Sequence, residues 1–348
     1  MTERHSSALS SNSVFRTAVL VTVVVALALL VWQLADVLLL AFAAILFAIV
    51  LRSIARPIET HTRIARRWSL ALAVLLIALL AAAFFVLLGA QIHAQASQLM
   101  DRFPELISSV GQRLGIDDLS GRLAEQAQNF SQRSGLLGKI AGYTSTLLGA
   151  VANLVLACVA AVYLAAQPER HRAGALMLIP QPLRDKVGSA FDNAGRALRL
   201  WLFGQLVSMM VVGVLATVGL YLIGMPSALA LGFLAGVSEF VPLVGPALAA
   251  IPAILVALSE GGTTIFWVLG LYLAIQQLEN NIIMPLVYRR TVELPPVVTL
   301  FAILVLGVLF GPAGVLLGAP LTVVLFVAVK QLYLRETLGE RTDVPGET

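Results

Sequence analysis

The stretch SALALGFLAGVSEFVPLVGPALAAIPAILVAL, residues 227–258, decides the fold class of this chain. It is apolar enough to lie in a lipid bilayer, but it is longer than the roughly 20 helical residues that cross about 30 Å of hydrocarbon. Glu239, Pro242 and the triplet Val244–Pro246 interrupt its middle. Because proline lacks an amide hydrogen and breaks helices, we predict two half-helices that enter the membrane and return to the same side.

The rest of the chain has the same apolar character. It is 59% hydrophobic and 12% charged, whereas soluble domains are about 25% charged. Stretches of spanning length recur, while the short alternating segments of an outer-membrane barrel do not. The sequence therefore predicts an all-α, polytopic helical membrane protein. The net charge of +4 arises from short loops beside apolar runs, so the lipid bilayer, and not a nucleic acid, is the expected partner.

Basic residues in the loops predict the orientation of the chain. Arginines crowd residues 52–67, and positive loops mark the cytoplasmic side, so both termini are predicted to be cytoplasmic. The predicted organisation is an N-terminal tail, a transmembrane scaffold, an extracytoplasmic helical segment, a transmembrane helix, a cytoplasmic amphipathic loop, a transport core and a C-terminal tail, over residues 1–16, 17–90, 91–141, 142–166, 167–200, 201–330 and 331–348.

The extracytoplasmic segment carries two apolar stripes. The spacing from Ile92 to Val110 favours one helix, and a weaker stripe from Leu119 to Phe130 favours a second that folds back on it. Two interpretations stay open: a self-packed cap outside the membrane, or a contact surface between subunits.

A second overlong apolar run covers residues 297–329 and is interrupted at Leu309–Gly314. GPAGVLLGAPLTVVL at 311–325 resembles GPALAAIPAILVAL at 245–258, since both place Gly-Pro-Ala at the interruption. The loop charges predict that the two hairpins enter from opposite faces, which is the pattern of an inverted-topology repeat. The predicted helix breaks are Pro242, Gly245, Pro246, Gly311, Pro312 and Pro320.

Charged side chains are scarce in the predicted transport core. From Trp201 to Tyr288 they are Glu239, Glu260 and Glu279. Glu260 precedes two glycines and is expected in a surface turn. The other two lie at membrane depth, where an ionised side chain costs about 2.5–3.5 kcal/mol on insertion scales, so they are candidates for function.

Polar side chains gather beside the last of these glutamates, in QQLENN at 276–281. On a helix they share one arc opposite an apolar face that includes Ile275, Leu278 and Ile282. We predict that the arc lines a polar site in which Glu279 and Glu239 bind a proton or cation and the amides bind a solute. The alternative is hydrogen bonding between helices. The predicted binding residues are Gln276, Gln277, Glu279, Asn280, Asn281 and Glu239.

Enzyme signatures are missing from the sequence. There is no H-E-x-x-H motif, no G-x-S-x-G elbow and no Walker A loop, and the four histidines lie outside the apolar spans. We therefore expect no catalytic residue, no metal site and no cofactor.

Three blocks of sequence are similar to those of a known family. VPLVGPALAAIPAILVAL at 241–258, QQLENNIIMPLVYRRTVELPPVV at 276–298 and GVLFGPAGVLLGAPL at 307–321 resemble the signature blocks of the autoinducer-2 exporter family of bacterial permeases. The resemblance covers nearly the whole chain, with departures at Leu243 and Pro295. It implies a multi-pass transporter of the bacterial inner membrane, assembled as a homo-oligomer that is a pentamer in relatives.

The expected function is secondary transport. The leading hypothesis is export of a small polar solute such as autoinducer-2, coupled to an ion or a proton. A second hypothesis is sodium or lithium exchange for protons. A third, from a different class, is a non-transporting membrane scaffold whose outer helices bind a partner.

Overall fold

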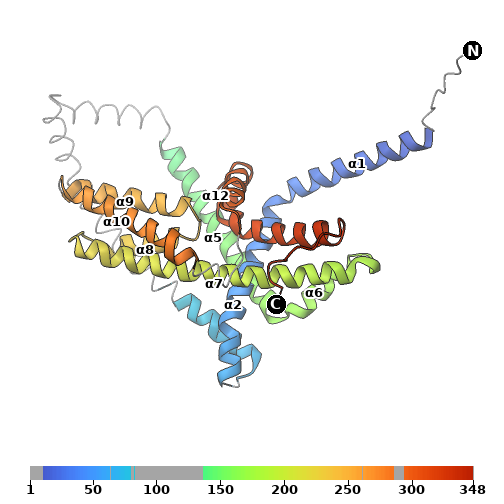
Figure 1. The fold of residues 1–348 in the computed structure, drawn as a ribbon, viewed down its shortest axis with the longest axis horizontal. Helices are drawn as coiled ribbons and strands as arrows, with labels where there is room; N and C mark the ends of the chain where they lie inside the picture. The colour runs from blue at the N-terminus through green and yellow to red at the C-terminus, as the bar shows by residue number, and fades with distance from the viewer. Residues whose placement is uncertain are drawn as a thin grey trace, which may run out of the picture.

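The computed structural model describes residues 11–62, 64–79, 82, 136–260, 262–285 and 294–347. Within these ranges every regular element is helical and no strand is present (Figure 1). Four of the described helices are long and apolar enough to cross a membrane. The prediction of an all-α, polytopic membrane protein is therefore confirmed. The predicted extracytoplasmic hairpin lies almost entirely outside the described residues.

The N-terminal part packs through small side chains. Its helices are α1 (Ser11–Gln33), α2 (Ala35–Thr62), a helix over residues 66–79, and α5 (Leu136–Ala166). Buried alanines such as Ala44, Ala48 and Ala161 lie where α2 and α5 meet. Small residues allow helix backbones to approach closely, which is the usual basis of packing between membrane helices.

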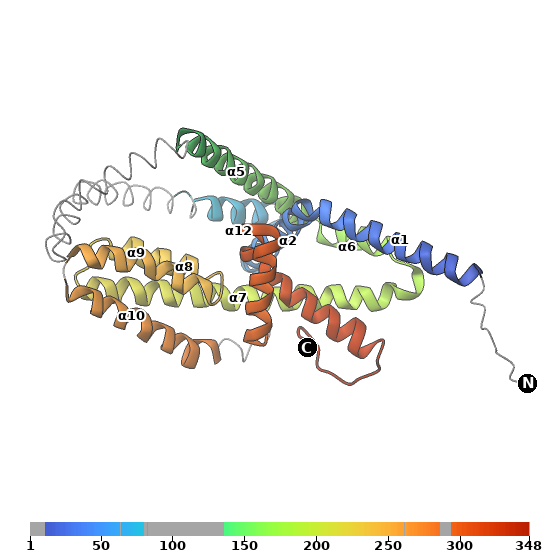
Figure 2. The same cartoon turned by 90° about the horizontal axis from the view of Figure 1, so that it is seen from above.

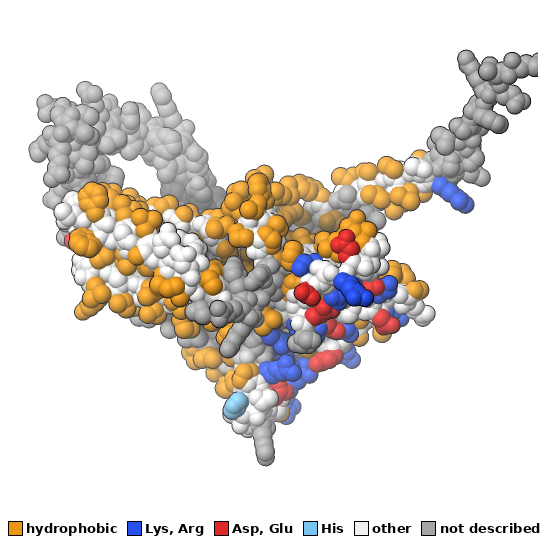
Figure 3. Space-filling model, in the orientation of Figure 1, with side chains coloured by type: hydrophobic (Ala, Val, Ile, Leu, Met, Phe, Trp, Pro, Cys, Tyr) orange, Lys and Arg blue, Asp and Glu red, His pale blue; other side chains and the backbone are white. Residues whose placement is uncertain are grey.

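A long helix, α7 (Arg184–Leu222), connects the two ends of the molecule. It follows α6 (Pro168–Met177) and the short turn η1 (Gln181–Leu183). The predicted amphipathic loop is thus largely helical, and its predicted boundary at residue 200 falls inside α7. The charged side chains gather around α6 and the first part of α7, whereas apolar side chains cover most of α8 to α10 (Figure 3).

The apolar run over residues 227–258 is split in two, into α8 (Ala228–Ser238) and α9 (Val244–Glu260). At the break Leu243 has a φ of 70°, a left-handed conformation that is rare for a branched side chain. A Cβ at Gly245 would overlap the carbonyl oxygen of Ser238. Glycine is therefore required for the close return of the chain.

After α9 the chain returns through α10 (Thr264–Leu278) and the π-helical turn η2 (Glu279–Ile283). The helices α7, α8, α9 and α10 lie side by side in both ribbon views (Figures 1 and 2). They enclose two apolar clusters, one of which contains Val212, Ala216 and Ile275. This bundle holds the candidate site.

The second overlong run forms α12 (Pro296–Ala328), which is broken at Gly311. The φ of 61° and ψ of −145° at Gly311 are accessible only to glycine. Beyond it the chain folds back, because Gly314 lies against Leu306 and Gly318 against Ile303. Pro320, a predicted break, lies inside the second half, which continues as a helix to Ala328. The inverted relation of the two hairpins stays a prediction.

A π-helical turn, η3 (Val329–Arg335), follows α12 and is joined to α7 by hydrogen bonds of Gln331, which is buried. The Asn193 amide donates to Gln331 Oε1 at 2.7 Å, and Gln331 Nε2 donates to Ser189 Oγ at 2.7 Å. Buried polar groups that are paired in this way fix the register of the elements that carry them.

Candidate functional site

A cavity of about 240 Å³ lies between α7, the α8–α9 hairpin and α10. We call it the glutamate cavity. Its walls are mostly apolar, and its polar side chains are two glutamates, a glutamine and a tyrosine. The lining residues are Val212, Ala216, Ala235, Glu239, Leu243, Pro246, Ala247, Ala250, Leu269, Tyr272, Leu273, Ile275, Gln276 and Glu279.

Glu239 is held where α8 ends and the backbone leaves the helix. Its side chain is 1% exposed. The amide of Gln205, on α7, donates to the Glu239 backbone carbonyl oxygen at 2.5 Å, which satisfies an acceptor released at the end of a helix. The carboxyl oxygen Oε2 is buried and has no hydrogen-bond partner among the described residues.

Glu279 faces Glu239 from the start of η2 and is 3% exposed. Gln276 Nε2 donates to Glu279 Oε2 at 3.2 Å, and the Ser208 hydroxyl lies beside the same carboxyl group. The two carboxyl groups are close enough to interact directly. Such a pair can share one proton, or hold one cation between its oxygens.

The polar side chains that point inward lie beside the π-helical turn η2. The Met284 N–H bonds to the Glu279 carbonyl oxygen, five residues back. Insertions of this kind are rare and occur frequently at functional sites. Gln276 and Glu279, three residues apart, face the cavity, and Ile283 is buried one turn further on.

The structure brings together three of the six predicted binding residues: Glu239, Gln276 and Glu279. The other three, Gln277, Asn280 and Asn281, are exposed. Asn281 Nδ2 donates to the Gln277 backbone oxygen at 2.9 Å and to its side-chain oxygen at 3.0 Å. The side chains of Gln277 and Asn281 therefore bond to each other along their own helix.

The apolar face opposite the polar arc is only partly buried. Ile275 is 7% exposed, whereas Leu278 is 37% and Ile282 is 51% exposed. The buried face of α10 and η2 thus mixes apolar residues with Gln276 and Glu279. On a helix, Ile275, Gln276 and Glu279 share an arc of about 100°, so the buried face is rotated from the apolar face that the sequence predicted.

Two residues of the site were missed from the sequence, Gln205 and Ser208 on α7. Both are polar and three residues apart inside the apolar stretch that begins at Trp201. The signal that identified the glutamates, a polar side chain within a spanning run, would have found them too.

The breaks of the two hairpins contribute unequally. Leu243 and Pro246, at the first break, line the glutamate cavity. The second break, at Gly311 and Pro312, belongs to α12, which contributes none of the described residues that line this cavity. The expectation that both hairpins enclose one site thus has support from the first hairpin alone.

A cation would find few ligands here beyond the carboxyl pair. In the part of the chain that is described, no three His, Cys, Asp or Glu side chains cluster as metal ligands. Two carboxyl groups with neighbouring amide and hydroxyl oxygens suit a proton or a hard monovalent cation better than a tightly held transition metal, which prefers nitrogen and sulfur ligands.

Comparison with known proteins gives the site a context. The chain matches the family described as AI-2E family transporter over residues 20–334. YrrI of Bacillus subtilis strain 168, a proposed transport protein, is 35% identical over 155 residues, which are 43% of this chain and 42% of YrrI. PerM of Escherichia coli K12, a proposed permease, is 27% identical over 274 residues, 74% of this chain and 76% of PerM.

A relative with a named cargo is more distant. The AI-2 transport protein TqsA of Escherichia coli K12 is 24% identical over 221 residues, which are 63% of this chain and 62% of TqsA. The chain spans about half the length of the first relatives it matches, 42% of YrrI and 58% of YueF of Bacillus subtilis.

Proposed function

Because the chain belongs to the AI-2E transporter family, we propose that it is a secondary transporter of the bacterial cytoplasmic membrane that couples a small polar solute to a proton or cation. Its apolar helices make it a multi-pass membrane protein. The coupling step is assigned to Glu239 and Glu279, and the solute is an AI-2-like molecule.

One observation carries this proposal: the Glu239 Oε2 oxygen is buried, has no partner among the described residues, and belongs to a carboxyl group that faces a second one. A buried polar atom without a partner costs about 1–3 kcal/mol. Such a cost in a native structure calls for an explanation, such as a ligand or ion that occupies the site in part of the working cycle. A transported proton or cation supplies that partner.

The neutral groups around the pair support the same role. Gln276 donates to Glu279, and Ser208 lies beside it, so neutral groups stabilise one carboxylate, and no arginine or lysine among the described residues pairs with it. A fixed positive charge would form a permanent salt bridge and compete with the transported cation. Neutral donors leave the carboxyl pair free to bind and release the transported cation.

The first hairpin is suited to control access to the pair. Leu243 and Pro246, from its break, line the cavity, and the left-handed backbone at Leu243 stores strain of about 1–3 kcal/mol. A small shift of the tip would open the cavity, in the way that broken helices in other transporters expose a site to each side in turn.

The test is coupled flux by the purified full-length chain in proteoliposomes, with AI-2, sodium and lithium as candidate cargoes. Glu279→Gln keeps the shape of the side chain and removes its charge. We expect coupled flux to fall roughly 10- to 100-fold, since hydrogen bonds to charged groups contribute about 1.5–3 kcal/mol. Glu260→Gln, the same change at an exposed residue, is the matched control. Undiminished coupling in Glu279→Gln would remove the carboxyl pair from the mechanism.

Exchange of sodium or lithium for protons is the second candidate function, and the facing carboxyl groups favour it directly. A pH-sensitive dye inside the vesicles distinguishes the two. Proton movement that starts on addition of sodium or lithium alone supports antiport, whereas movement that requires AI-2 supports solute export.

A further inference from the structure

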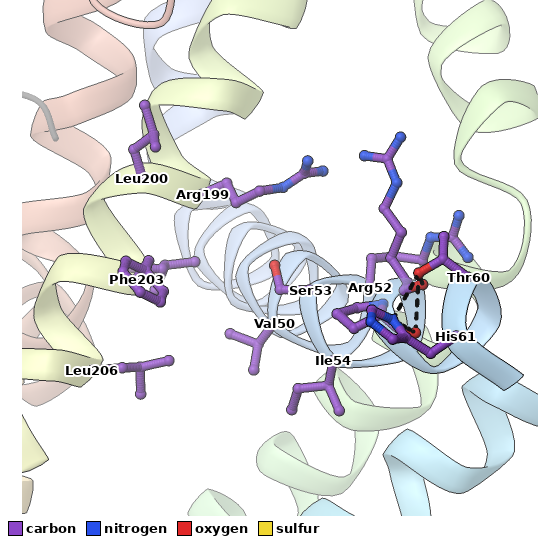
Figure 4. A pocket seen from close by; sticks show the side chains of 13 residues that line it. Val50, Arg52, Ser53, Ile54, Thr60, His61, Arg199, Leu200, Phe203 and Leu206 are labelled. Atoms are coloured by element: carbon purple, nitrogen blue, oxygen red, sulfur yellow. Dashed lines mark hydrogen bonds between the residues drawn. The ribbon is translucent and has the colours of Figure 1, made fainter. Parts of the chain in front are cut away.

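A second cavity, of about 630 Å³, lies between α2 and α7, away from the glutamates (Figure 4). We call it the arginine cavity, because Arg52 and Arg56 of α2 and Arg199 of α7 line it. These three residues are close enough to influence one another electrostatically. Like charges held in one cavity repel each other, so an anion between them is favoured.

Acidic partners neutralise this group only in part. The Arg52 Nη1 atom lies 3.6 Å from Glu59 Oε2, yet the same nitrogen is buried without a hydrogen-bond partner among the described residues. No ion pair joins Arg56 or Arg199 to another residue in the described part of the chain. Thr60 and His61 bond back to α2, so the guanidinium groups are the free donors of the cavity.

The opposite end of the cavity is apolar. Figure 4 shows Arg199 reaching from α7 across the opening, with Phe203 and Leu206 further along the same helix and Val50 and Ile54 facing them from α2. Phe203 is 64% and Leu206 is 46% exposed. The cavity thus presents guanidinium groups at one end and uncovered apolar side chains at the other.

The position of the arginines along both helices matches a membrane interface. On α2 an apolar stretch ends at Leu51, immediately before Arg52, and on α7 the charged first part ends at Arg199, immediately before an apolar stretch. Two helices that pack against each other therefore change from polar to apolar at the same level. Lipid headgroups occupy that level in a bilayer.

We propose that the arginine cavity binds the headgroup of an anionic phospholipid. The lipid phosphate accepts hydrogen bonds from the guanidinium groups, which match phosphate in a bidentate manner, and the acyl chains lie along Phe203 and Leu206. Basic pockets between membrane helices bind anionic headgroups in this way. A free phosphate would satisfy the arginines alone and leave the apolar end uncovered, so the amphiphile fits both ends.

The test measures binding of dioctanoyl phosphatidylglycerol to the full-length chain in detergent, with dioctanoyl phosphatidylcholine and inorganic phosphate as comparison probes. We expect phosphatidylglycerol to bind more tightly than either. Arg199→Gln should weaken it about five- to tenfold, because each basic residue near an anionic lipid contributes on the order of a fivefold change in affinity. Arg199→Lys, which keeps the charge, should restore most of the affinity.

The matched control is Arg170→Gln, which removes a charge from an exposed arginine that does not line the cavity; it should bind the lipid as the unaltered chain does. Thermal unfolding of each variant shows that it remains folded. Equal weakening by Arg170→Gln and Arg199→Gln would overturn the proposal. Inorganic phosphate that displaces the lipid at equal concentration would also overturn it, since the site would then be one for a soluble anion.

Discussion

The glutamate cavity and the arginine cavity are lined by the same helix, α7, yet they differ in sign and in depth. Glu239 and Glu279 are 1% and 3% exposed and face each other within the bundle. The arginines lie where α2 and α7 turn from apolar to charged. A long arginine side chain can reach water or a headgroup from an interfacial position, whereas a buried glutamate must find its partners inside the protein. We propose that this contrast distinguishes a site for a transported species from a site for a membrane lipid.

The two cavities also differ in the backbone that presents their side chains. The glutamates come from irregular backbone, one at the break after α8 and one at the start of a π-helical turn. The arginines come from regular stretches of α2 and α7. Changes to the backbone geometry at the first break should therefore affect the glutamate cavity and spare the arginine cavity.

The largest effect is expected from Gly245→Ala. The added Cβ would overlap the Ser238 carbonyl oxygen, and overpacking against backbone costs about 1–3 kcal/mol or more. Because Glu239 follows Ser238 directly, the shift should displace the carboxyl pair and lower coupled flux roughly 10- to 100-fold. Flux in proteoliposomes and phosphatidylglycerol binding are measured on the same preparation.

Gly262→Ala is the control, because a Cβ at Gly262 meets no atom within 4 Å. It should leave both flux and lipid binding unchanged. If Gly245→Ala transported normally, the close return of the chain would not be what positions the glutamates. If it lost lipid binding as severely as flux, the two cavities would not be independent.

A smaller effect is expected from Gln205→Leu, which removes the donor to the Glu239 carbonyl oxygen. The acceptor is then buried without a partner, at a cost of about 1–3 kcal/mol, so the unfolding temperature in detergent should fall. Gln167→Leu, the same change at an exposed glutamine, should leave it nearly unchanged. Equal unfolding temperatures for the two variants would show that the bond contributes little, and that α8 ends at Glu239 for other reasons.

The sequence alone predicts the hairpins and the two central glutamates, because those signals are local. Proline and glycine at the first break exclude a continuous helix, and a carboxyl group at membrane depth stands out in an apolar run. The charged part of a long helix is harder to predict from the sequence. Residues 184–200 look like a charged loop, yet they continue directly into the apolar part of α7, because nothing in the sequence ends the helix at residue 200.

The arrangement within the site depends on tertiary packing. The neighbours of α10 and η2 determine which arc of this helix is buried, and they leave Gln276 facing the cavity while Asn281 is exposed. Pro320 is a predicted break, yet the helix continues through it. A proline inside a packed hairpin is accommodated when neighbouring groups bond to the backbone groups that it leaves unpaired. A single-helix projection contains no neighbouring helices, so it grouped amides that the fold separates.

The smallest effect is expected from Asn281→Ala, and it tests which amides belong to the site. Asn281 is exposed and donates to Gln277 on its own helix, so coupled flux should stay within about twofold of the unaltered chain. Gln276→Ala removes the donor to Glu279 and should lower flux roughly fivefold, which corresponds to about 1 kcal/mol for one hydrogen bond. A larger loss from Asn281→Ala than from Gln276→Ala would falsify the placement of the site at the carboxyl pair. The solute path would then run along the exposed face of η2, and the glutamate cavity would be a packing feature of the bundle.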